Sequence, residues 1–120
     1  MGFRFPKAAR LSRSLEFRRV REEGRSLGGS CFLFGYLRDA EPGVPARFGI
    51  VTSRRLGGAV VRVRARRRLR EAIRHERSGF APGSWVVLIA RRGCLEQSLP
   101  ALRAELLRLA GRASILSPLS

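Results

Sequence analysis

The stretch GGAVVRVRARRRLREAIRHER, residues 57–77, decides how the rest of the chain is interpreted. If each residue advances by about 100°, as in an α-helix, its small and apolar residues fall within about a third of the circle. These residues are Val61, Ala65, Leu69, Ala72 and Ile73. The periodicity predicts a helix over residues 54–77 that buries this face on a sheet.

Arginines occupy the opposite arc of the predicted helix. The arc is formed by Arg66, Arg67, Arg70, Arg74 and Arg77. Val63 lies in the middle of it, as an apolar residue in the densest part of the charge. Glu71 and Glu76 can offset only part of this charge, and like charges one turn apart destabilise a helix. We therefore expect the face to bind a polyanion.

The composition of the whole chain points to the same kind of partner. Its 120 residues include 25 Lys and Arg against 9 Asp and Glu, which gives a formal net charge of +16. An anionic membrane is the rival partner, but the longest plainly apolar run, residues 86–90, is far too short to span one. We expect a cytoplasmic protein that binds nucleic acid and no membrane.

The length and the hydrophobic content of 44% suit one small domain. We expect a loose arm over residues 1–10, a domain over residues 11–111 and a C-terminal tail over residues 112–120. A short helix is predicted from Ser12 or Ser14 to Gly24, where glycine favours a helix end.

Three strands are predicted around the basic helix. Residues 31–37 and 47–53 are expected to pair as an antiparallel hairpin with a long loop. Residues 84–90 form a nearly continuous apolar run, which is typical of a central, covered strand. The helix between the last two strands predicts that they are parallel neighbours.

A last helix is predicted after Ser98, a favourable N-cap residue, with Pro100 in its first turn and Gly111 at its end. Its apolar stripe consists of Leu99, Leu102, Leu106 and Leu109. The resulting order is α-β-β-α-β-α, which predicts an α+β fold built as a small two-layer sandwich.

The chain offers few residues for catalysis or metal binding. Its one histidine, His75, stands among arginines, and the acidic residues form no pattern with it. Cys31 and Cys94 form no CxxC motif and are expected to be buried or half-buried free thiols. We expect no catalytic group and no metal site, and a protein-only nuclease is the weaker hypothesis.

The segment SRRLGGAVVRVRARRRLREAIR, residues 53–74, resembles the signature of the bacterial ribonuclease P protein subunit. That signature is a basic pair, Gly, Asn, Ala-Val, Arg-Asn-Arg and a basic run ending in Leu-Arg-Glu-Ala. The matching residues are Arg54, Arg55, Gly57, Ala59, Val60, Arg62, Arg64, Arg66, Arg67, Arg68, Arg70 and Glu71. Residues 10–26 resemble the first helix of the family, and residues 86–93 resemble its last strand and the basic residues after it, so the resemblance covers residues 10–110.

Three positions depart from the family pattern. Gly58 replaces the Asn before Ala-Val, Val63 replaces the Asn of Arg-Asn-Arg, and Arg21 replaces a second aromatic residue one turn after Phe17. Glycine also serves a helix start well. Val63 removes any hydrogen bond that the amide makes, and Arg21 exchanges stacking for phosphate contact.

The resemblance implies a left-handed crossover between the parallel strands, against the usual right-handed preference. It also implies a role in tRNA 5′ maturation, with the hydrolysis performed by a catalytic RNA that uses Mg²⁺. The implied partners are ribonuclease P RNA, with one protein per RNA, and precursor tRNA. The RNA-binding residues implied or predicted are Arg54, Arg55, Arg62, Arg64, Arg66, Arg67, Arg68, Arg70, Arg74, Arg91 and Arg92.

The family's cleft between the first helix and the sheet implies a second site, for the single-stranded 5′ leader of precursor tRNA. Phe17 and Arg21 are the contacts expected from the helix. On the strand at residues 31–37, alternate side chains form two rows, of which one is core and the other faces the cleft. The rows are Phe32, Phe34 and Tyr36, and Leu33, Gly35 and Leu37. Tyr36 is included among the predicted leader contacts.

Two other functions remain open from the sequence. A structural RNA-binding protein without an enzyme role would carry the same charge. A DNA-binding regulator would usually bring Asn or Gln to base edges, and the basic helix has neither.

Overall fold

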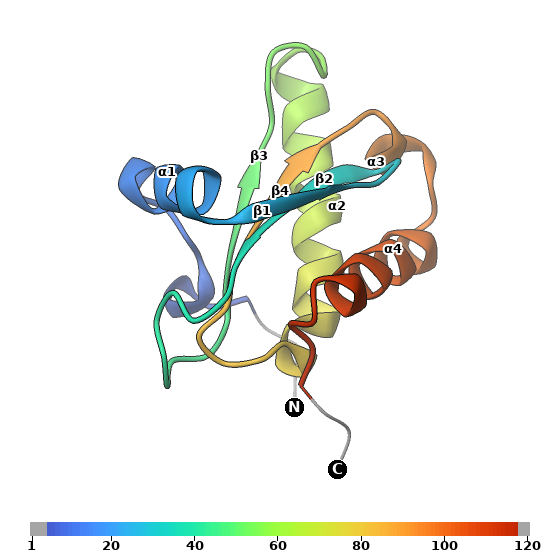
Figure 1. The fold of residues 1–120 in the computed structure, drawn as a ribbon. Helices are drawn as coiled ribbons and strands as arrows, with labels where there is room; N and C mark the ends of the chain where they lie inside the picture. Colours follow the sequence, from blue (N-terminus) through green and yellow to red (C-terminus); the bar gives the residue numbers. More distant parts are fainter. Residues whose placement is uncertain (1–4, 118–120) are drawn as a thin grey trace.

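The computed structural model describes residues 5–117 and follows the expected order of elements, with several short additions (Figure 1). The helices are α1 (Ser14–Glu23), α2 (Ala59–Glu76), α3 (Gly93–Glu96) and α4 (Leu99–Arg112). The strands are β1 (Arg25–Gly28), β2 (Phe32–Leu37), β3 (Arg47–Val51) and β4 (Trp85–Ala90), and 3₁₀ turns lie at Lys7–Ala9 and Arg77–Gly79. Across residues 5–117, no helix is long and apolar enough to cross a membrane.

The strands form one sheet in the order β1-β2-β4-β3. The expected parallel pairing of β3 with β4 is confirmed, with Arg47 opposite Trp85. The expected hairpin of β2 with β3 is wrong, because β4 lies between them and pairs antiparallel with β2. The continuous apolar sequence of β4 suits this central position, where both edges are paired and all of its residues except Ile89 are buried.

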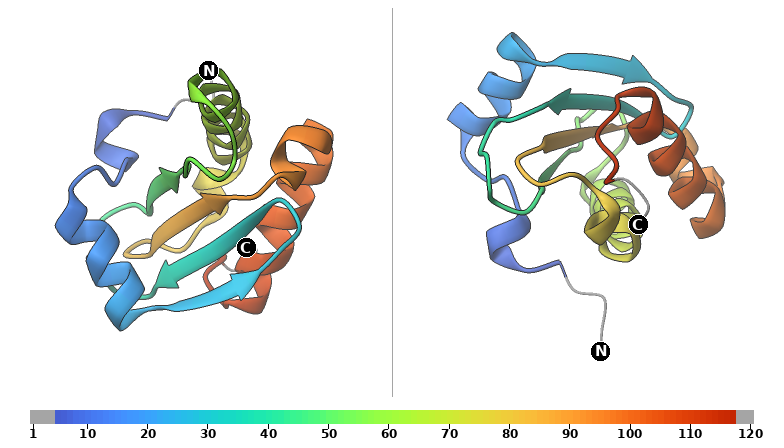
Figure 2. Two further views of the ribbon diagram at one scale, coloured as in Figure 1. Left: turned by 90° about the horizontal axis from the view of Figure 1, so that it is seen from above. Right: turned by 60° about the horizontal axis from the view of Figure 1, so that its bottom comes forward.

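The crossover from β3 through α2 to β4 is left-handed, as the resemblance implies. In Figure 1 both strands point upward, β4 lies to the right of β3, and α2 lies behind them. The view from above in Figure 2 shows the same placement of α2. Seen from the side of α2 with the strands pointing upward, the chain therefore moves to the left from β3 to β4. This is a left-handed crossover, whereas β-α-β crossovers are almost always right-handed.

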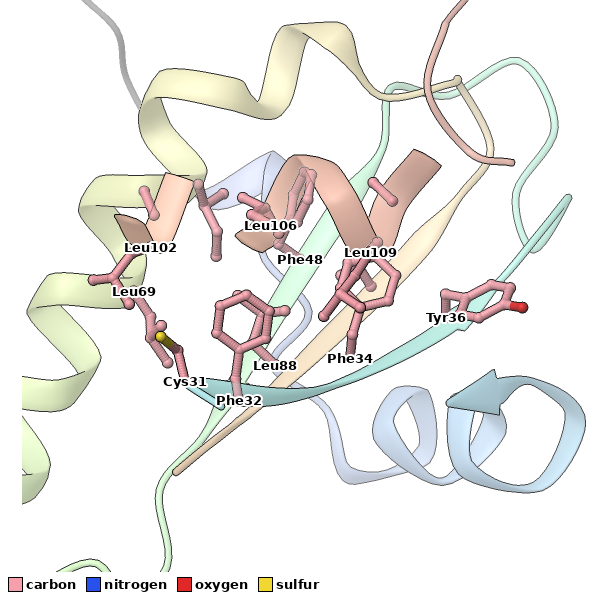
Figure 3. Close-up of a cluster of buried hydrophobic side chains, with 14 of the residues drawn as sticks. Cys31, Phe32, Phe34, Tyr36, Phe48, Leu69, Leu88, Leu102, Leu106 and Leu109 are labelled. Carbon is pink, nitrogen blue, oxygen red and sulfur yellow. The ribbon is translucent and has the colours of Figure 1, made fainter. Parts of the chain in front are cut away.

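The main core lies between the sheet and the helices α2 and α4 (Figure 3). The predicted buried face of α2 is confirmed, since Ala65, Leu69, Ala72 and Ile73 are each 0% exposed. The α4 stripe also packs there through Leu102, Leu106 and Leu109. On the other side of the sheet, α1 packs over a smaller cluster that contains Leu11, Val20, Trp85 and Val87.

The loose arm expected over residues 1–10 is wrong for the part that the structure describes. Phe5 is buried, and its ring meets Phe48 edge-on at 6.2 Å between centroids. Arg10 donates to the Phe5 carbonyl through Nε at 3.0 Å and Nη2 at 2.8 Å. The free energy gained by burying an aromatic ring against β3 outweighs the conformational entropy that the segment loses on ordering. Residues 1–4 lie outside the described residues.

The C-terminal boundary also differs from the expectation of a tail after residue 111. The helix α4 continues to Arg112, one residue beyond the expected end at Gly111. Ile115 is 1% exposed, and Leu116 forms a β-bridge with Phe80. Residues 113–117 therefore complete the core beside α4, and residues 118–120 lie outside the described residues.

Candidate nucleic-acid interface

The helix α2 begins later than predicted, because a turn precedes it. The backbone N–H of Leu56 donates to the Ser53 carbonyl at 3.1 Å, and that of Gly57 donates to the Arg54 carbonyl at 3.2 Å. Gly57 has a φ of 152°, which suits glycine, and a Cβ there would lie 2.9 Å from the Val61 side chain. Arg54 and Arg55 are therefore exposed on the turn, just before the first turn of α2.

The outer face of α2 carries the predicted positive charge. Arg64, Arg67 and Arg70 are exposed along it. Val63 lies on the same face with 42% of its surface exposed, which confirms the position predicted from the helical periodicity. No acidic residue of the first three turns relieves this charge, since Glu71 is the first one in the helix.

Some arginines of this face also bind the protein itself. Arg68 donates from Nε to the Cys94 carbonyl at 2.7 Å and also donates to the Gln97 carbonyl. Arg64 donates to the Leu95 carbonyl at 3.5 Å. These carbonyls belong to α3 and its C-terminus, so Arg68 fixes α3 against α2. The resemblance assigned Arg68 to RNA binding alone and did not predict this contact.

Three arginines, which we call the Arg10 cluster, come together at one side of α2: Arg66 and Arg70 belong to the helix, and Arg10 lies in the segment before α1. Arg66 donates to Thr52 Oγ1 at 2.8 Å. Burial, followed by the charges of Arg10 and Arg66, lowers the pKa of Arg70. An anion would relieve this repulsion. Arg10 was not predicted as a binding residue, because it comes from the segment that was expected to be loose.

The C-terminal part of α2 is less available than predicted. Arg74 pairs with Glu71, and His75 Nε2 lies 3.2 Å from the same carboxylate. The hydrogen bond from the Arg74 side chain lowers the pKa of Glu71. Arg62, also predicted to bind RNA, is half-buried, and its Nε is shielded from solvent. The exposed charge of α2 is therefore densest between Arg64 and Arg70.

Arg91 and Arg92 are exposed between β4 and α3, directly after the central strand. Arg91 donates from Nη1 to the Gly29 carbonyl at 2.7 Å, which holds it beside the β1–β2 turn. Arg92 is the N-cap residue of α3, the short helix that Arg68 contacts. Both residues are placed where an anionic partner can reach them.

A groove of about 370 Å³ lies on the other side of the sheet, between α1 and the strands. Its lining residues are Phe17, Val20, Arg21, Gly24, Arg25, Ser26, Leu33, Gly35, Val51, Val87 and Ile89. It brings together Phe17 and Arg21, the two leader contacts predicted on α1. Arg25 and Ser26 were missed, because the edge strand β1 has no apolar alternation that would reveal it.

Tyr36 was predicted at this groove, and the structure corrects that prediction. Tyr36 is 7% exposed and belongs to the main core, with its ring 5.9 Å from that of Phe34 (Figure 3). The groove is instead lined by Leu33 and Gly35, which belong to the other row of β2. The aromatic row buries more apolar area under α4, whereas the small residues of the other row leave room for the groove.

The described residues offer little for catalysis. No group of three or more His, Cys, Asp or Glu within residues 5–117 could hold a metal ion. Cys31 and Cys94 are buried free thiols, and burial raises the pKa of Cys94 to about 11. Burial also raises the pKa of Cys31, so both thiols are protonated near neutral pH and are poor nucleophiles.

A basic helix face on one layer and a groove with an aromatic and two arginines on the other define a class of protein: a small α+β protein that binds RNA. The comparisons with known proteins make this specific. The chain matches the family described as Ribonuclease P over residues 5–114. The chain therefore belongs to the ribonuclease P protein family, the protein components of a tRNA-processing ribonucleoprotein endoribonuclease.

Relatives and solved structures agree with this assignment. The chain is 40% identical over 110 residues to the ribonuclease P protein component of Symbiobacterium thermophilum, covering 92% of this chain and 95% of that one. It is 39% identical over 112 residues to that of Roseiflexus castenholzii, covering 91% and 88%.

Among solved structures, the ribonuclease P protein from Thermotoga maritima superposes with a TM-score of 0.73 at 28% identity, over 86% of this chain and 96% of that one. The Staphylococcus aureus protein gives 0.76 at 24% identity, over 92% and 100%, and supports the fold.

Proposed function

We propose that this chain is the protein subunit of a bacterial ribonuclease P, with two RNA-binding surfaces. The outer face of α2 docks on the catalytic RNA, and the groove beside α1 holds the single-stranded 5′ leader of precursor tRNA. The complex then removes the leader and forms the mature tRNA 5′ end. The observation that carries this proposal is that the basic face belongs to α2 and the groove lies beside α1, on opposite sides of one sheet. Figure 2 shows the two helices on the two sides of the sheet.

The α2 surface suits a folded RNA. Guanidinium groups donate in pairs to phosphate oxygens and remain charged at any physiological pH. The Arg10 cluster extends this surface beyond the helix, because Arg10 comes from the segment before α1. An RNA phosphate bound there would relieve the mutual repulsion among the three arginines. With Arg54 and Arg55 before α2 and Arg91 and Arg92 after β4, the surface is wide enough to hold a shaped RNA backbone.

The groove suits a single strand. Phe17 offers a ring for stacking on a base, and the arginines Arg21 and Arg25 can bind the phosphates on either side. The floor is apolar at Leu33, Val51 and Val87 and presents no charged group that would read a particular base. We therefore expect leader binding with little sequence preference.

In this proposal the chemistry belongs to the RNA. The phosphodiester is hydrolysed by the catalytic RNA with Mg²⁺ held by RNA groups, since the described residues provide no carboxylate cluster for it. The protein binds and orients the leader and lowers the repulsion between the two RNAs. We expect one protein per RNA and a cytoplasmic complex.

A reconstitution assay separates this function from that of a structural RNA-binding protein. The chain is added to a bacterial ribonuclease P RNA at low Mg²⁺. Cleavage is then compared for a precursor tRNA whose single-stranded 5′ leader is long enough to reach the groove and for one whose leader is too short to reach it. We expect the protein to raise cleavage of the long-leader precursor most. Binding to the RNA without any increase in cleavage would favour the structural role.

A further inference from the structure

The arginine face of α2 contains an apolar hollow, which we call the valine notch. Val60 is 84% exposed and Val63 is 42% exposed, although both lie among arginines. A depression of about 400 Å³ is present there. Its lining residues are Ala59, Val60, Val63, Arg64, Arg67 and Arg68. An apolar hollow between arginines suits a ligand that brings an apolar group together with negative charge.

Internal hydrogen bonds hold the Arg68 wall of the valine notch firmly and the Arg64 wall weakly. Arg68 Nε is held by the Cys94 carbonyl at 2.7 Å, and Arg64 Nη2 is held by the Leu95 carbonyl at 3.5 Å. Their guanidinium groups therefore point toward α3, while the methylene stems line the notch. An apolar surface that is already ordered loses little entropy when a ligand binds.

Arg67 is the third arginine of the notch and differs from the other two. It is exposed and makes no hydrogen bond within residues 5–117. Its charge is therefore available at the rim. A ligand for this site must combine a negative charge at the rim with a flat apolar group in the hollow.

A nucleotide that is unstacked from its RNA has both features, because its base is planar and apolar on its faces and the phosphates on either side are joined to it through the sugar. We propose that the valine notch binds one unstacked base of the catalytic RNA, with Arg67 on a neighbouring phosphate. This inference rests on the proposed docking of α2 on that RNA. Val63, which replaces an Asn of the signature, then contributes apolar contact in place of an amide hydrogen bond.

Substitution of Val63 tests the proposal, with ribonuclease P RNA as the probe. We expect Val63→Ser to weaken RNA binding about fivefold, the size expected for losing apolar contact with one side chain. Because no charge changes, the slope of log K against log salt stays the same. Val63→Ile keeps an apolar side chain at the same position and is expected to retain affinity.

Two further variants separate this inference from the proposed function. Leu15→Ser removes another exposed apolar residue, 67% exposed on α1, and should leave RNA-subunit binding unchanged. Arg67→Ala should weaken binding and reduce the salt slope by about 1. If Arg67→Ala binds like the unaltered protein, the docking surface itself is wrong. If Arg67→Ala weakens binding and Val63→Ser binds like the unaltered protein, the notch binds no base.

Chemical probing of the bases supplies a readout that a change in folding would not produce. With the unaltered protein, we expect at least one RNA base to be protected from base-modifying reagents. With Val63→Ser at saturating protein, that base regains reactivity while backbone protection stays the same. Identical base protection by the two proteins would overturn the proposal. Restoring the signature residue with Val63→Asn should also weaken binding, and a tighter complex would contradict the apolar role.

Discussion

The carboxylate of Glu16 joins α1 to β3, because its Oε2 accepts a hydrogen bond of 2.8 Å from Arg47 Nη1. Its other oxygen accepts from the backbone N–H groups of Ser12 at 2.9 Å and Arg13 at 3.0 Å, at the start of α1. One carboxylate thus caps the helix and ties it to the sheet. Since α1 forms one wall of the groove, this contact sets the position of Phe17 and Arg21.

Glu16→Gln is expected to destabilise the protein by about 1.5 kcal/mol, because it replaces charge-assisted hydrogen bonds of a half-buried group by neutral ones. We also expect weaker binding of leader-bearing precursor in the assembled enzyme. Glu23→Gln is the matched control, since Glu23 pairs with Arg19 on the surface with 58% of its side chain exposed. Urea unfolding and precursor binding check both variants, and equal effects would contradict the role of Glu16.

The same contact predicts a pH dependence. Burial opposes ionisation of Glu16, but the N–H groups of Arg13 and Ser12 and the Arg47 guanidinium outweigh it and hold its pKa below the ordinary value. A lowered folded-state pKa stabilises the protein above the unfolded pKa, about 4.3 for Glu, and this contribution is lost as pH falls through the folded pKa. The stability difference between the unaltered protein and Glu16→Gln should therefore shrink below about pH 4. A difference that stays constant from pH 7 to pH 3 would show that ionisation of Glu16 is not the cause.

Gly49 on β3 is predicted to be essential for the placement of Phe17. A Cβ at Gly49 would lie 2.5 Å from Phe17 Cε1 and 3.2 Å from Leu11 Cβ. We expect Gly49→Ala to displace the ring, to cost about 2 kcal/mol and to weaken precursor binding. Gly35→Ala, on the same face of the sheet, is the control for stability, because its Cβ would be 3.5 Å from the nearest atom, the Val87 carbonyl oxygen. Unchanged stability and precursor binding in Gly49→Ala would contradict the packing of Phe17 on this strand.

Glu105 is predicted to be a structural anchor with no part in RNA binding. It is 6% exposed in α4 and accepts hydrogen bonds from Ser30 Oγ at 2.9 Å and the Cys31 N–H at 2.8 Å. Glu105→Ala leaves both donors without their partner and should cost about 3 kcal/mol in urea unfolding. Glu96→Ala, at an exposed position, should cost little. If the folded Glu105→Ala protein binds RNA weakly, Glu105 has a further role.

The elements with a strong period were predictable from sequence, and those held by distant contacts were not. The buried face of α2 and the outward position of Val63 follow from the helical repeat, and the central place of β4 follows from its continuous apolar run. Pairing partners do not follow from such patterns, so β2 was expected to pair with β3 and the edge strand β1 was not predicted. The left-handed crossover came only from the resemblance.

The candidate site was predicted in part for the same reason. Alternation on β2 separates two rows of side chains but does not say which row is core, so Tyr36 was placed at the groove and lies in the core instead. Arg10 and Arg25 reach their surfaces through packing of segments that have no periodic signal. The hydrogen bonds from Arg68 to the Cys94 and Gln97 carbonyls depend on α3, a helix of one turn that no capping pattern in the sequence indicates.

The central claim is that docking on the catalytic RNA and binding of the leader use separate surfaces, and two substitutions measured in parallel test it most directly. Affinity for the RNA subunit and affinity of the assembled enzyme for leader-bearing precursor are measured for Arg70→Ala and Phe17→Ala. We predict that Arg70→Ala weakens RNA-subunit binding about tenfold through a lost phosphate contact. Phe17→Ala should weaken precursor affinity about tenfold through lost stacking, with RNA-subunit binding unchanged. Equal effects of both substitutions on both affinities would contradict the account.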